Sequence, residues 1–186
     1  LNGRRFRDLC AHPLVTPVAL TPAHRDLMGL QPDTTVIGSP APQIDPVDPD
    51  SREPGKLLLL ARASPIKGHR LAISATLIMR EEGQNVNLHL SLAQNHQWVM
   101  GLGSEEGIHA HGWMTDVEKR ELLRGAGLLL IPSEFEGMPV VAMEALSCGL
   151  PILASPACEG ILGGGGSIVP HLAARLWADA ITAILN

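Results

Sequence analysis

The stretch that decides the fold is GLLLIPSEFEGMPVVAMEALSCGLPILAS, residues 127–155. It begins with a continuous apolar run, residues 128–131, which is typical of a strand buried on both faces. A helix is expected next, with Pro139 in its first turn. It should end at Cys148, because the following Gly suits a left-handed position and a Pro comes two residues later. With a second apolar strand at 152–154, the stretch predicts a parallel βαβ unit.

The alternation of strand and helix continues on both sides of this stretch. Upstream, strands are expected at residues 56–61, 86–92 and 108–112. One helix is expected at 69–82. A second helix begins at a capping box formed by Thr115 and Glu118 and runs through Arg124. Downstream, a short strand at 167–169 and a helix from about 171 to 185 are expected. Regular alternation of this kind predicts an α/β fold, a parallel sheet with helices on both faces.

The first 52 residues follow a different pattern. Strand candidates around 15–20 and 34–37 flank a short helix that Thr21 opens as N-cap. Residues 39–54 are rich in Pro and Asp, which is typical of an extended, semi-rigid linker. A domain boundary is therefore expected between residues 1–52 and the α/β part at 53–186.

Composition restricts the class of protein. The 186 residues are 45% hydrophobic and 18% charged, with a formal net charge of −5, as is typical of a soluble globular protein. Few aromatic residues and no Lys/Arg-rich run argue against a nucleic-acid surface. No apolar stretch approaches the roughly 20 residues of a bilayer span, and the N-terminus lacks a signal-peptide layout. The expected compartment is the cytoplasm.

Three residue types invite a chemical interpretation that the spacing does not favour. The three cysteines are odd in number and lack C-x-x-C spacing, so reduced structural thiols are expected. His109 and His111 could share a strand face as metal ligands, but no acidic or Cys partner lies close in sequence, and solvated strand residues are favoured. The glycine run 163–166 lacks the Lys-Ser/Thr of a P-loop, so a surface turn is favoured. No metal site is expected.

Ligands of open parallel sheets bind at loops that follow the carboxyl ends of strands. The loop after strand 56–61 carries Arg62 and Lys67, with Gly68 opening the helix behind them. This combination suits a diphosphate, because guanidinium and ammonium groups neutralise its oxygens and helix amides add a favourable dipole. For this loop taken alone, the alternative of two solvated surface cations is favoured.

The loop after strand 128–131 is more informative. Glu136 in this loop and Glu144 in the next helix enclose seven residues. At about 1.5 Å per residue, Glu144 lies roughly 7 Å along the helix axis from the loop, so the two carboxylates address different parts of one ligand. The amides around Gly137, Met138 and Val140 are expected to point at an anionic group. An alternative for Glu144 is a helix-face carboxylate paired with a neighbouring cation.

Three segments resemble motifs of glycosyltransferase family 4, whose members are retaining enzymes with two facing Rossmann-like domains (GT-B type). They are PSEFEGMPVVAMEALSCGLPILAS (132–155), ARASPIKGHR (61–70) and HGWMTD (111–116), in the family's order. The resemblance covers essentially residues 13–186. It implies that 1–52 is the end of the N-terminal domain with the interdomain linker. Residues 53–186 would be a Rossmann-like nucleotide-sugar-binding domain, the C-terminal half of a GT-B enzyme.

The resemblance assigns roles by motif position. The implied catalytic residues are Glu136, at the donor sugar, and Arg62 and Lys67, at the donor diphosphate. The implied binding residues are Glu144 at the ribose and Trp113 and Met114, whose backbone would lie beside the nucleobase. Gly137, Met138 and Val140 are binding candidates from their place at the helix start, where their amides face an anionic group. The chain departs from the family pattern at Ala61 in place of Gly, at 92–95 in place of a glycine-bearing turn, and at 158–160 in place of Gly-Gly-x-x-Glu.

The function that the resemblance implies is retaining transfer of a hexosyl group from a nucleoside-diphosphate sugar to an acceptor such as a glycan or lipid. No cofactor or metal is expected, because cations of the protein would stabilise the leaving group. The partners would be the nucleotide sugar and an N-terminal acceptor-binding domain. That domain has no room in 186 residues, so the isolated chain is expected to be inactive. Peripheral membrane association through it stays open.

The alternative to an enzyme is a non-catalytic nucleotide-sugar-binding fragment or degenerate relative. A third hypothesis, an NAD-dependent dehydrogenase, would need a glycine fingerprint between Ala61 and His69. Only Gly68 stands there. Sequence patterns therefore favour a nucleotide-sugar site over a dinucleotide site.

Overall fold

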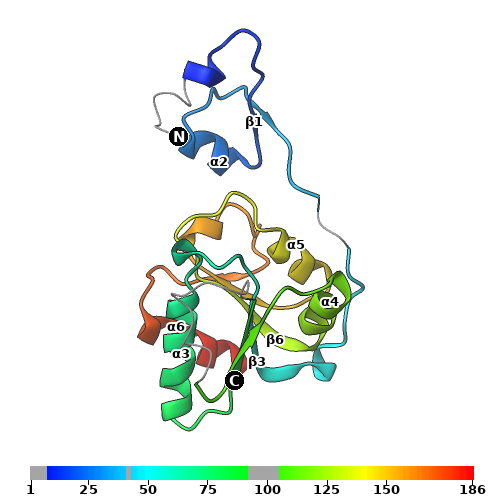
Figure 1. Ribbon diagram of the computed structural model, residues 1–186, viewed down its shortest axis with the longest axis vertical. Helices are drawn as coiled ribbons and strands as arrows, with labels where there is room; N and C mark the ends of the chain where they lie inside the picture. Colours follow the sequence, from blue (N-terminus) through cyan, green and yellow to red (C-terminus); the bar gives the residue numbers. More distant parts are fainter. Residues whose placement is uncertain (1–7, 41–42, 92–104) are drawn as a thin grey trace.

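The structure, a computed structural model, describes residues 8–40, 43–91 and 105–186. Figure 1 shows a small unit that an extended connection joins to a larger α/β body. The small unit contains β1 (Val18–Ala19), α2 (Pro22–Leu27) and β2 (Thr35–Val36), with β1 and β2 paired in parallel. Thr21 is the N-cap of α2, as predicted, and its side chain accepts a bond of 2.9 Å from the His24 amide.

The body is built on one parallel sheet. Its strands are β3 (Glu53–Leu59), β4 (Asn87–Ser91), β5 (Ile108–His111), β6 (Ala126–Ile131), β7 (Ile152–Ala154) and β8 (Ser167–Ile168). They lie in the order β5-β4-β3-β6-β7-β8, and every neighbouring pair is parallel. This is the doubly wound Rossmann order, in which the direction of winding reverses between the first strand and the fourth. Here the reversal falls between β3 and β6.

Helices cover both faces of this sheet. They are α3 (His69–Glu81), α4 (Asp116–Gly125), α5 (Val140–Ser147) and α6 (Ala174–Leu185), with short 3-10 turns η1 (Pro49–Ser51), η2 (Pro65–Lys67) and η3 (Pro156–Cys158). Leu57 and Leu59 of β3 are buried in one cluster with α3 and α6, whereas Leu58 is buried in another with α4 and α5. Successive strand residues point to opposite faces, so one apolar run serves both layers. The predicted α/β fold is confirmed.

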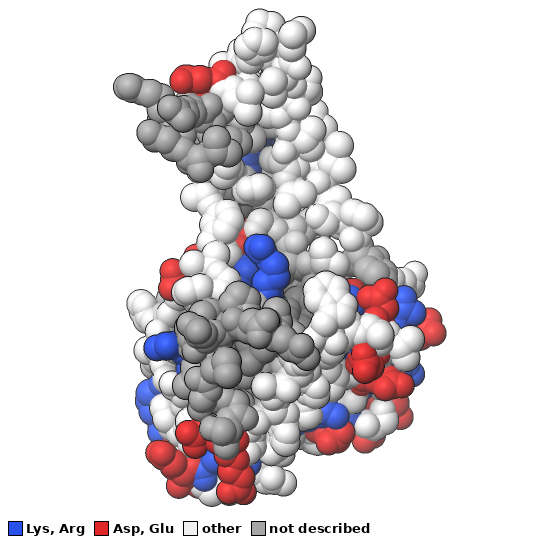
Figure 2. Space-filling view, viewed as in Figure 1, with Lys and Arg blue, Asp and Glu red and all other residues white. Residues whose placement is uncertain are grey.

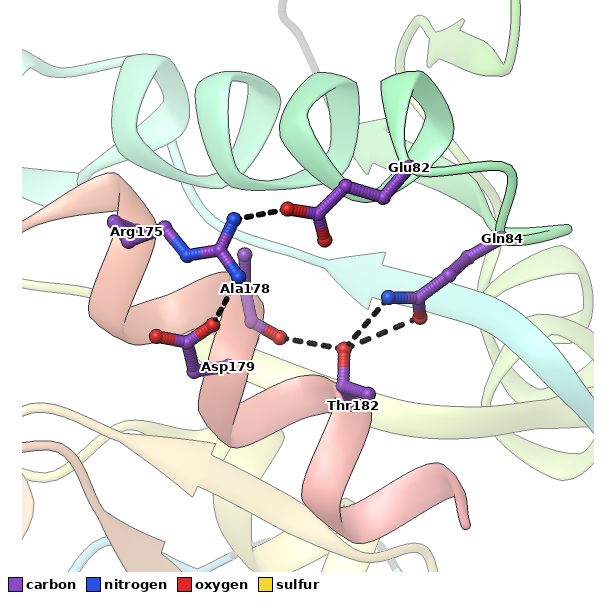
Figure 3. A network of polar contacts seen from close by, with 6 residues as sticks. All are labelled: Glu82, Gln84, Arg175, Ala178, Asp179 and Thr182. Atoms are coloured by element: carbon purple, nitrogen blue, oxygen red, sulfur yellow. Dashed lines mark hydrogen bonds and ion pairs between the residues drawn. The ribbon is translucent and has the colours of Figure 1, made fainter.

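Polar contacts fix α6 on α3 (Figure 3). Arg175 bridges Glu82, at the end of α3, and Asp179 of its own helix. One turn further on, the Gln84 amide donates a 3.0 Å bond to the Thr182 hydroxyl. These contacts flank the buried apolar surface between the two helices, so they set the register of the pair more than its strength.

Several element boundaries differ from the sequence-based expectation. The last helix begins at Ala174, three residues later than expected, because the chain is still extended at Ala173. Pro139 is the N-cap of α5 and lies just before its first turn. β3 begins at Glu53, inside the segment expected as linker, where it lies against Gly127. A Cβ on Gly127 would lie 2.3 Å from the Pro54 carbonyl oxygen, so the close approach of β3 and β6 requires glycine.

A buried arginine ties the linker to the body. The Arg52 guanidinium donates bonds of 2.6 to 3.2 Å to the carbonyl oxygens of Leu123, Arg124, Ala126 and Cys148. These carbonyls lie at or beside the C-terminal ends of α4 and α5, where no intrahelical donor is available. Arg52 thus closes both helix ends on the face that carries α4 and α5.

Among the helices that the structure describes, none has the length and apolar character that crossing a bilayer demands.

Candidate functional site

Two cavities adjoin at the carboxyl ends of β3 and β6, where the winding reverses. The larger, which we call the Glu144 cavity, has a volume of about 830 Å³. The smaller, the Glu136 cavity, has a volume of about 370 Å³. Both linings contain the same five residues, Leu60, Ala61, Arg62, Val140 and Val141. The cavities therefore share a wall, and Arg62 stands in it.

The two loops that form this wall are locked together at Gly68. Gly68 has a positive φ of 70°, and a Cβ there would lie 2.2 Å from the Pro132 carbonyl oxygen. The Glu134 amide donates a 2.8 Å bond to the Ile66 carbonyl oxygen beside it. A side chain at position 68 would push the loop after β3 away from the loop after β6. Glycine at this position is what allows the basic and acidic side chains to meet.

Lys67 and Glu136 meet in the Glu136 cavity. The Lys67 ammonium lies 2.7 Å from Glu136 Oε1, and the two side chains are only 15% and 8% exposed. The Ser133 hydroxyl donates a 2.6 Å bond to the same oxygen. Sequence reasoning identified the lysine and the glutamate but missed Ser133. It had no signal for Ser133, because a serine after a strand is usually only a turn residue.

Glu144 is almost completely buried in the wall of the larger cavity. Its Oε1 lies 2.6 Å from the ammonium of Lys119, on α4, and the carboxylate side chain is 3% exposed. Asp116 stands 3.8 Å from the same ammonium. The pairing with a cation, an alternative that the sequence left open, is therefore present. Lys119 itself lines the cavity with Glu144, and no sequence pattern singled it out.

The other candidates divide between the cavities and the small unit. Trp113 and Met114, which follow β5, line the Glu144 cavity, and Trp113 is 92% exposed at its rim. Val140 lines both cavities, but neither lining includes Gly137 or Met138. Gly137 lies against Leu20 and His24 of the small unit, and Met138 Sδ is 3.1 Å from the amide of Ser39, where the linker begins. Of the three predicted amide positions, only that of Val140 reaches the cavity walls.

Two basic side chains belong to the walls of these cavities. Figure 2 shows one blue group on the part of the body nearest the small unit, and further blue and red groups are spread over the rest of this face. Arg62 is exposed and belongs to both cavity linings, and Lys67 belongs to the smaller one. The site therefore holds two basic residues from one loop within an acidic protein of net charge −5. A guanidinium or an ammonium group in a cavity wall can bind an anionic ligand.

The cysteines have no place in this chemistry. All three, Cys10, Cys148 and Cys158, are free thiols. Burial, together with the Glu136 charge, raises the pKa of Cys158 to about 12, so this thiol near the Glu136 cavity stays protonated. A protonated thiol is a poor nucleophile. Free thiols at all three positions agree with the expectation of reduced cysteines, and burial of Cys148 and Cys158 suits a structural role.

The histidines form a cluster that the sequence indicated only in part. His109 and His111 share a face of β5, and His89 of β4 joins them, with its Nδ1 2.9 Å from His111 Nε2. Burial and the two neighbouring histidines lower the pKa of His89 to about 4, and burial also lowers that of His111. Within residues 8–40, 43–91 and 105–186, no group of three or more His, Cys, Asp or Glu side chains could hold a metal ion. Residues 92–95, which stand in place of the family's glycine-bearing turn after the strand that carries His89, lie outside the described residues.

Comparison with known proteins shows the family of the chain. An MMP alpha-(1->4)-mannosyltransferase of Mycolicibacterium hassiacum is 28% identical over 184 residues, which are 95% of this chain and 42% of that protein. A D-inositol 3-phosphate glycosyltransferase of Mycolicibacterium smegmatis is 30% identical over 199 residues, covering 100% of this chain and 41% of that protein. The chain thus spans about two fifths of the length of these curated relatives.

Solved structures agree with the fold. The crystal structure of TarM matches 98% of this chain with a TM-score of 0.77 and 16% identity, over 39% of its own length. The GtfA/B complex matches 91% with a TM-score of 0.66 and 18% identity, over 38% of that chain. The sequence model of the family described as glycosyl transferases group 1 matches residues 54–186. That match includes every element from β4 to α6 and nearly all of β3, so the protein belongs to the group 1 glycosyltransferases.

Proposed function

We propose that this chain binds the nucleoside-diphosphate-sugar donor of a retaining, family 4 type glycosyltransferase. One observation carries the proposal. Two cavities adjoin where the winding of the sheet reverses, and each contains a glutamate that is ion-paired with a lysine. Arg62 lies in the wall that the cavities share. A donor has three parts in a line, a nucleoside, a diphosphate and a sugar. The larger cavity, the cationic wall and the smaller cavity correspond to these parts in the same order.

The Glu144 cavity suits the nucleoside. A carboxylate is an acceptor-only group with two oxygens, so it can accept bonds from the two hydroxyls of a ribose. Lys119 compensates the charge of Glu144 while that carboxylate is buried. Trp113 and Met114 supply apolar surface at the rim for a base. The volume of about 830 Å³ is within the range of ordinary small-molecule sites.

The shared wall suits the diphosphate. Arg62 supplies a fixed guanidinium fork, and the first-turn amide of α5 at Val140 adds a donor and the positive end of a helix dipole. An ammonium has three donor hydrogens, so Lys67 can hold Glu136 and a phosphate oxygen together. In the proposal these groups stabilise the leaving diphosphate, and no metal or cofactor takes part.

The transfer step that we propose breaks the bond between C1 of the sugar and the diphosphate oxygen, whose electron pair stays on the diphosphate. The acceptor oxygen forms its bond to C1 on the same face, and its proton passes to the departing phosphate. Glu136 orients the sugar and stabilises the positive charge that develops on it. Arg62 and Lys67 stabilise the negative charge of the leaving group. This chain provides no separate general base in the mechanism.

The relative named as a mannosyltransferase supports a hexosyl group as the transferred unit. A glycan or lipid acceptor would bind to a second, N-terminal domain of a longer polypeptide. Any peripheral membrane association would also belong to that domain. For the 186-residue chain alone we therefore expect donor binding without turnover. Turnover by this chain alone would contradict that division of labour.

Calorimetric titration of the chain with UDP, GDP and ADP, and then with their sugars, tests the donor site. At least one nucleotide should bind, and Arg62→Ala should weaken that binding about tenfold, because a charge-assisted bond to phosphate is lost. Arg120→Ala is the matched control, since Arg120 is exposed on α4 and absent from both cavity linings. If a folded sample binds none of these ligands at millimolar concentration, the proposal is wrong.

A further inference from the structure

Glu136 receives two hydrogen bonds on a single oxygen. Ser133 Oγ lies 2.6 Å and Lys67 Nζ 2.7 Å from Oε1. Ser133 is 2% exposed, so its hydroxyl has little access to water as an alternative partner. Oε2 is the oxygen that these two donors do not use. The carboxylate is therefore fixed in rotation, with one defined oxygen left for a ligand.

Ser133 is itself held by the neighbouring strand. It lies two residues beyond the end of β6, and Ser155 follows β7 directly. The Ser155 hydroxyl donates a 2.5 Å bond to the Ser133 carbonyl oxygen, and the Ser155 amide donates a 3.0 Å bond to the carbonyl oxygen of Ile131. Two strand ends thus hold the backbone from which the Ser133 hydroxyl projects.

The two donors to Glu136 differ in what they can enforce. An ammonium on a flexible four-carbon stem is a compact point charge, so it compensates a carboxylate without defining the angle of its plane. A buried hydroxyl on a strand end has a fixed position and defines that angle. If Lys67 also turns part of its hydrogen-bonding capacity toward a phosphate, Ser133 still holds the carboxylate.

We infer that Ser133 is a positioning residue that orients Glu136 toward the sugar of the donor. The inference rests on the proposed function for its ligand, whereas the contact itself exists without any ligand. Its signature is selective. Loss of the hydroxyl should weaken binding of the sugar part of the donor and leave binding of the nucleoside diphosphate unchanged, because Glu144, Arg62 and Val140 are untouched.

The experiment compares a nucleoside diphosphate with its sugar in the 186-residue chain by calorimetry. Ser133→Ala should lower the affinity for the nucleotide sugar about tenfold and keep the affinity for the free diphosphate. In a Glu136→Ala background, which removes the acceptor of the Ser133 hydroxyl, Ser133→Ala should have no further effect on the sugar. Thr76→Val is the matched control, because Thr76 is a fully buried residue of α3 whose hydroxyl donates a bond to the Ala72 carbonyl and which is absent from both cavity linings.

A ligand-free arm keeps the inference separable from the proposed function. Urea unfolding of the unaltered chain, the two single variants and the double variant at Ser133 and Glu136 gives four unfolding constants. The effect of the double variant on this constant should differ by about tenfold from the product of the two single effects. If the single effects multiply to the double effect, or if Ser133→Ala leaves the preference for the nucleotide sugar unchanged, the inference is overturned. If the unaltered chain binds no nucleotide, the proposed function fails, and the unfolding cycle alone then decides whether Ser133 holds Glu136.

Discussion

Glu136 and Glu144 form nearly equal ion pairs in very different surroundings. The distances to Lys67 and Lys119 are 2.7 and 2.6 Å. Glu136 belongs to a loop and shares its oxygen with Ser133, whereas Glu144 lies in the middle of α5. A helix backbone fixes the direction of a side chain by itself, but a loop does not. The loop carboxylate therefore depends on side-chain donors for its orientation, and the helical carboxylate depends on them mainly for charge compensation.

The largest expected effect tests charge compensation at Glu144. Lys119→Met should lower the free energy of unfolding by about 3 kcal/mol, because it leaves a buried carboxylate without its cation. Urea denaturation monitored by circular dichroism measures this. Adding Glu144→Gln to Lys119→Met is the control, and it should restore most of the loss. A loss below about 0.5 kcal/mol, the usual range of a surface substitution, would mean that Glu144 needs no compensation by Lys119.

The equivalent change at the loop carboxylate should cost less. Lys67→Met should lower the free energy of unfolding by about 1.5 kcal/mol, because Glu136 keeps its bond from Ser133 and borders an open cavity. The same denaturation series measures it, with Lys67→Met/Glu136→Gln as control. Equal losses for the two lysine variants would break the distinction between a loop-held and a helix-held carboxylate.

Ligand binding should separate the two glutamates by the part of the donor that they contact. Glu144→Gln should weaken a nucleoside diphosphate and its sugar equally, by about tenfold, because one charged acceptor for ribose is lost. Glu136→Gln should weaken only the nucleotide sugar. Calorimetry with both ligands on both variants measures this. If Glu136→Gln weakens the free diphosphate as well, the assignment of the two cavities is wrong.

The smallest effect concerns the stability that His89, on β4, makes sensitive to acid. Burial, with His109 and His111 nearby, puts the pKa of folded His89 at about 4, below the ordinary value of 6.5. Between these values the unfolded chain binds more protons, so stability rises with pH and is lost as pH falls from 6.5 toward 4. His89→Gln should reduce this acid loss by about 1 kcal/mol, after allowance for solvent screening.

The free energy of unfolding is measured at pH 7.5, about one pH unit above this window, and at pH 5, near its middle. The difference between the two values gives the acid loss, and comparison with His89→Gln gives the share of His89. His12→Gln is the control, because His12 lies in the small unit, away from the cluster. An acid loss in His89→Gln as large as in the unaltered chain would show that His89 does not carry it. The comparison of the two glutamates should then be repeated at both pH values.

Sequence patterns predicted the scaffold of the site better than its contacts. The loops after β3 and β6 were identified because a parallel sheet places strand ends at one edge, and Arg62, Lys67 and Glu136 were found there. Gly137 and Met138 illustrate the limit. They lie in the expected loop, but their orientation toward the small unit depends on how that unit packs, which no local pattern encodes.

The sequence by itself determined the order and direction of the strands and helices, the faces that they bury and the loops that carry charge. Apolar periodicity and chain direction are local properties, and they suffice for that. Only the tertiary structure decided that Lys119 compensates Glu144 and that Arg52 closes two helix ends. The partners in these contacts stand 25 to 96 positions apart. Such pairs form because packed layers bring them together, and their spacing in the chain has no period from which to predict them.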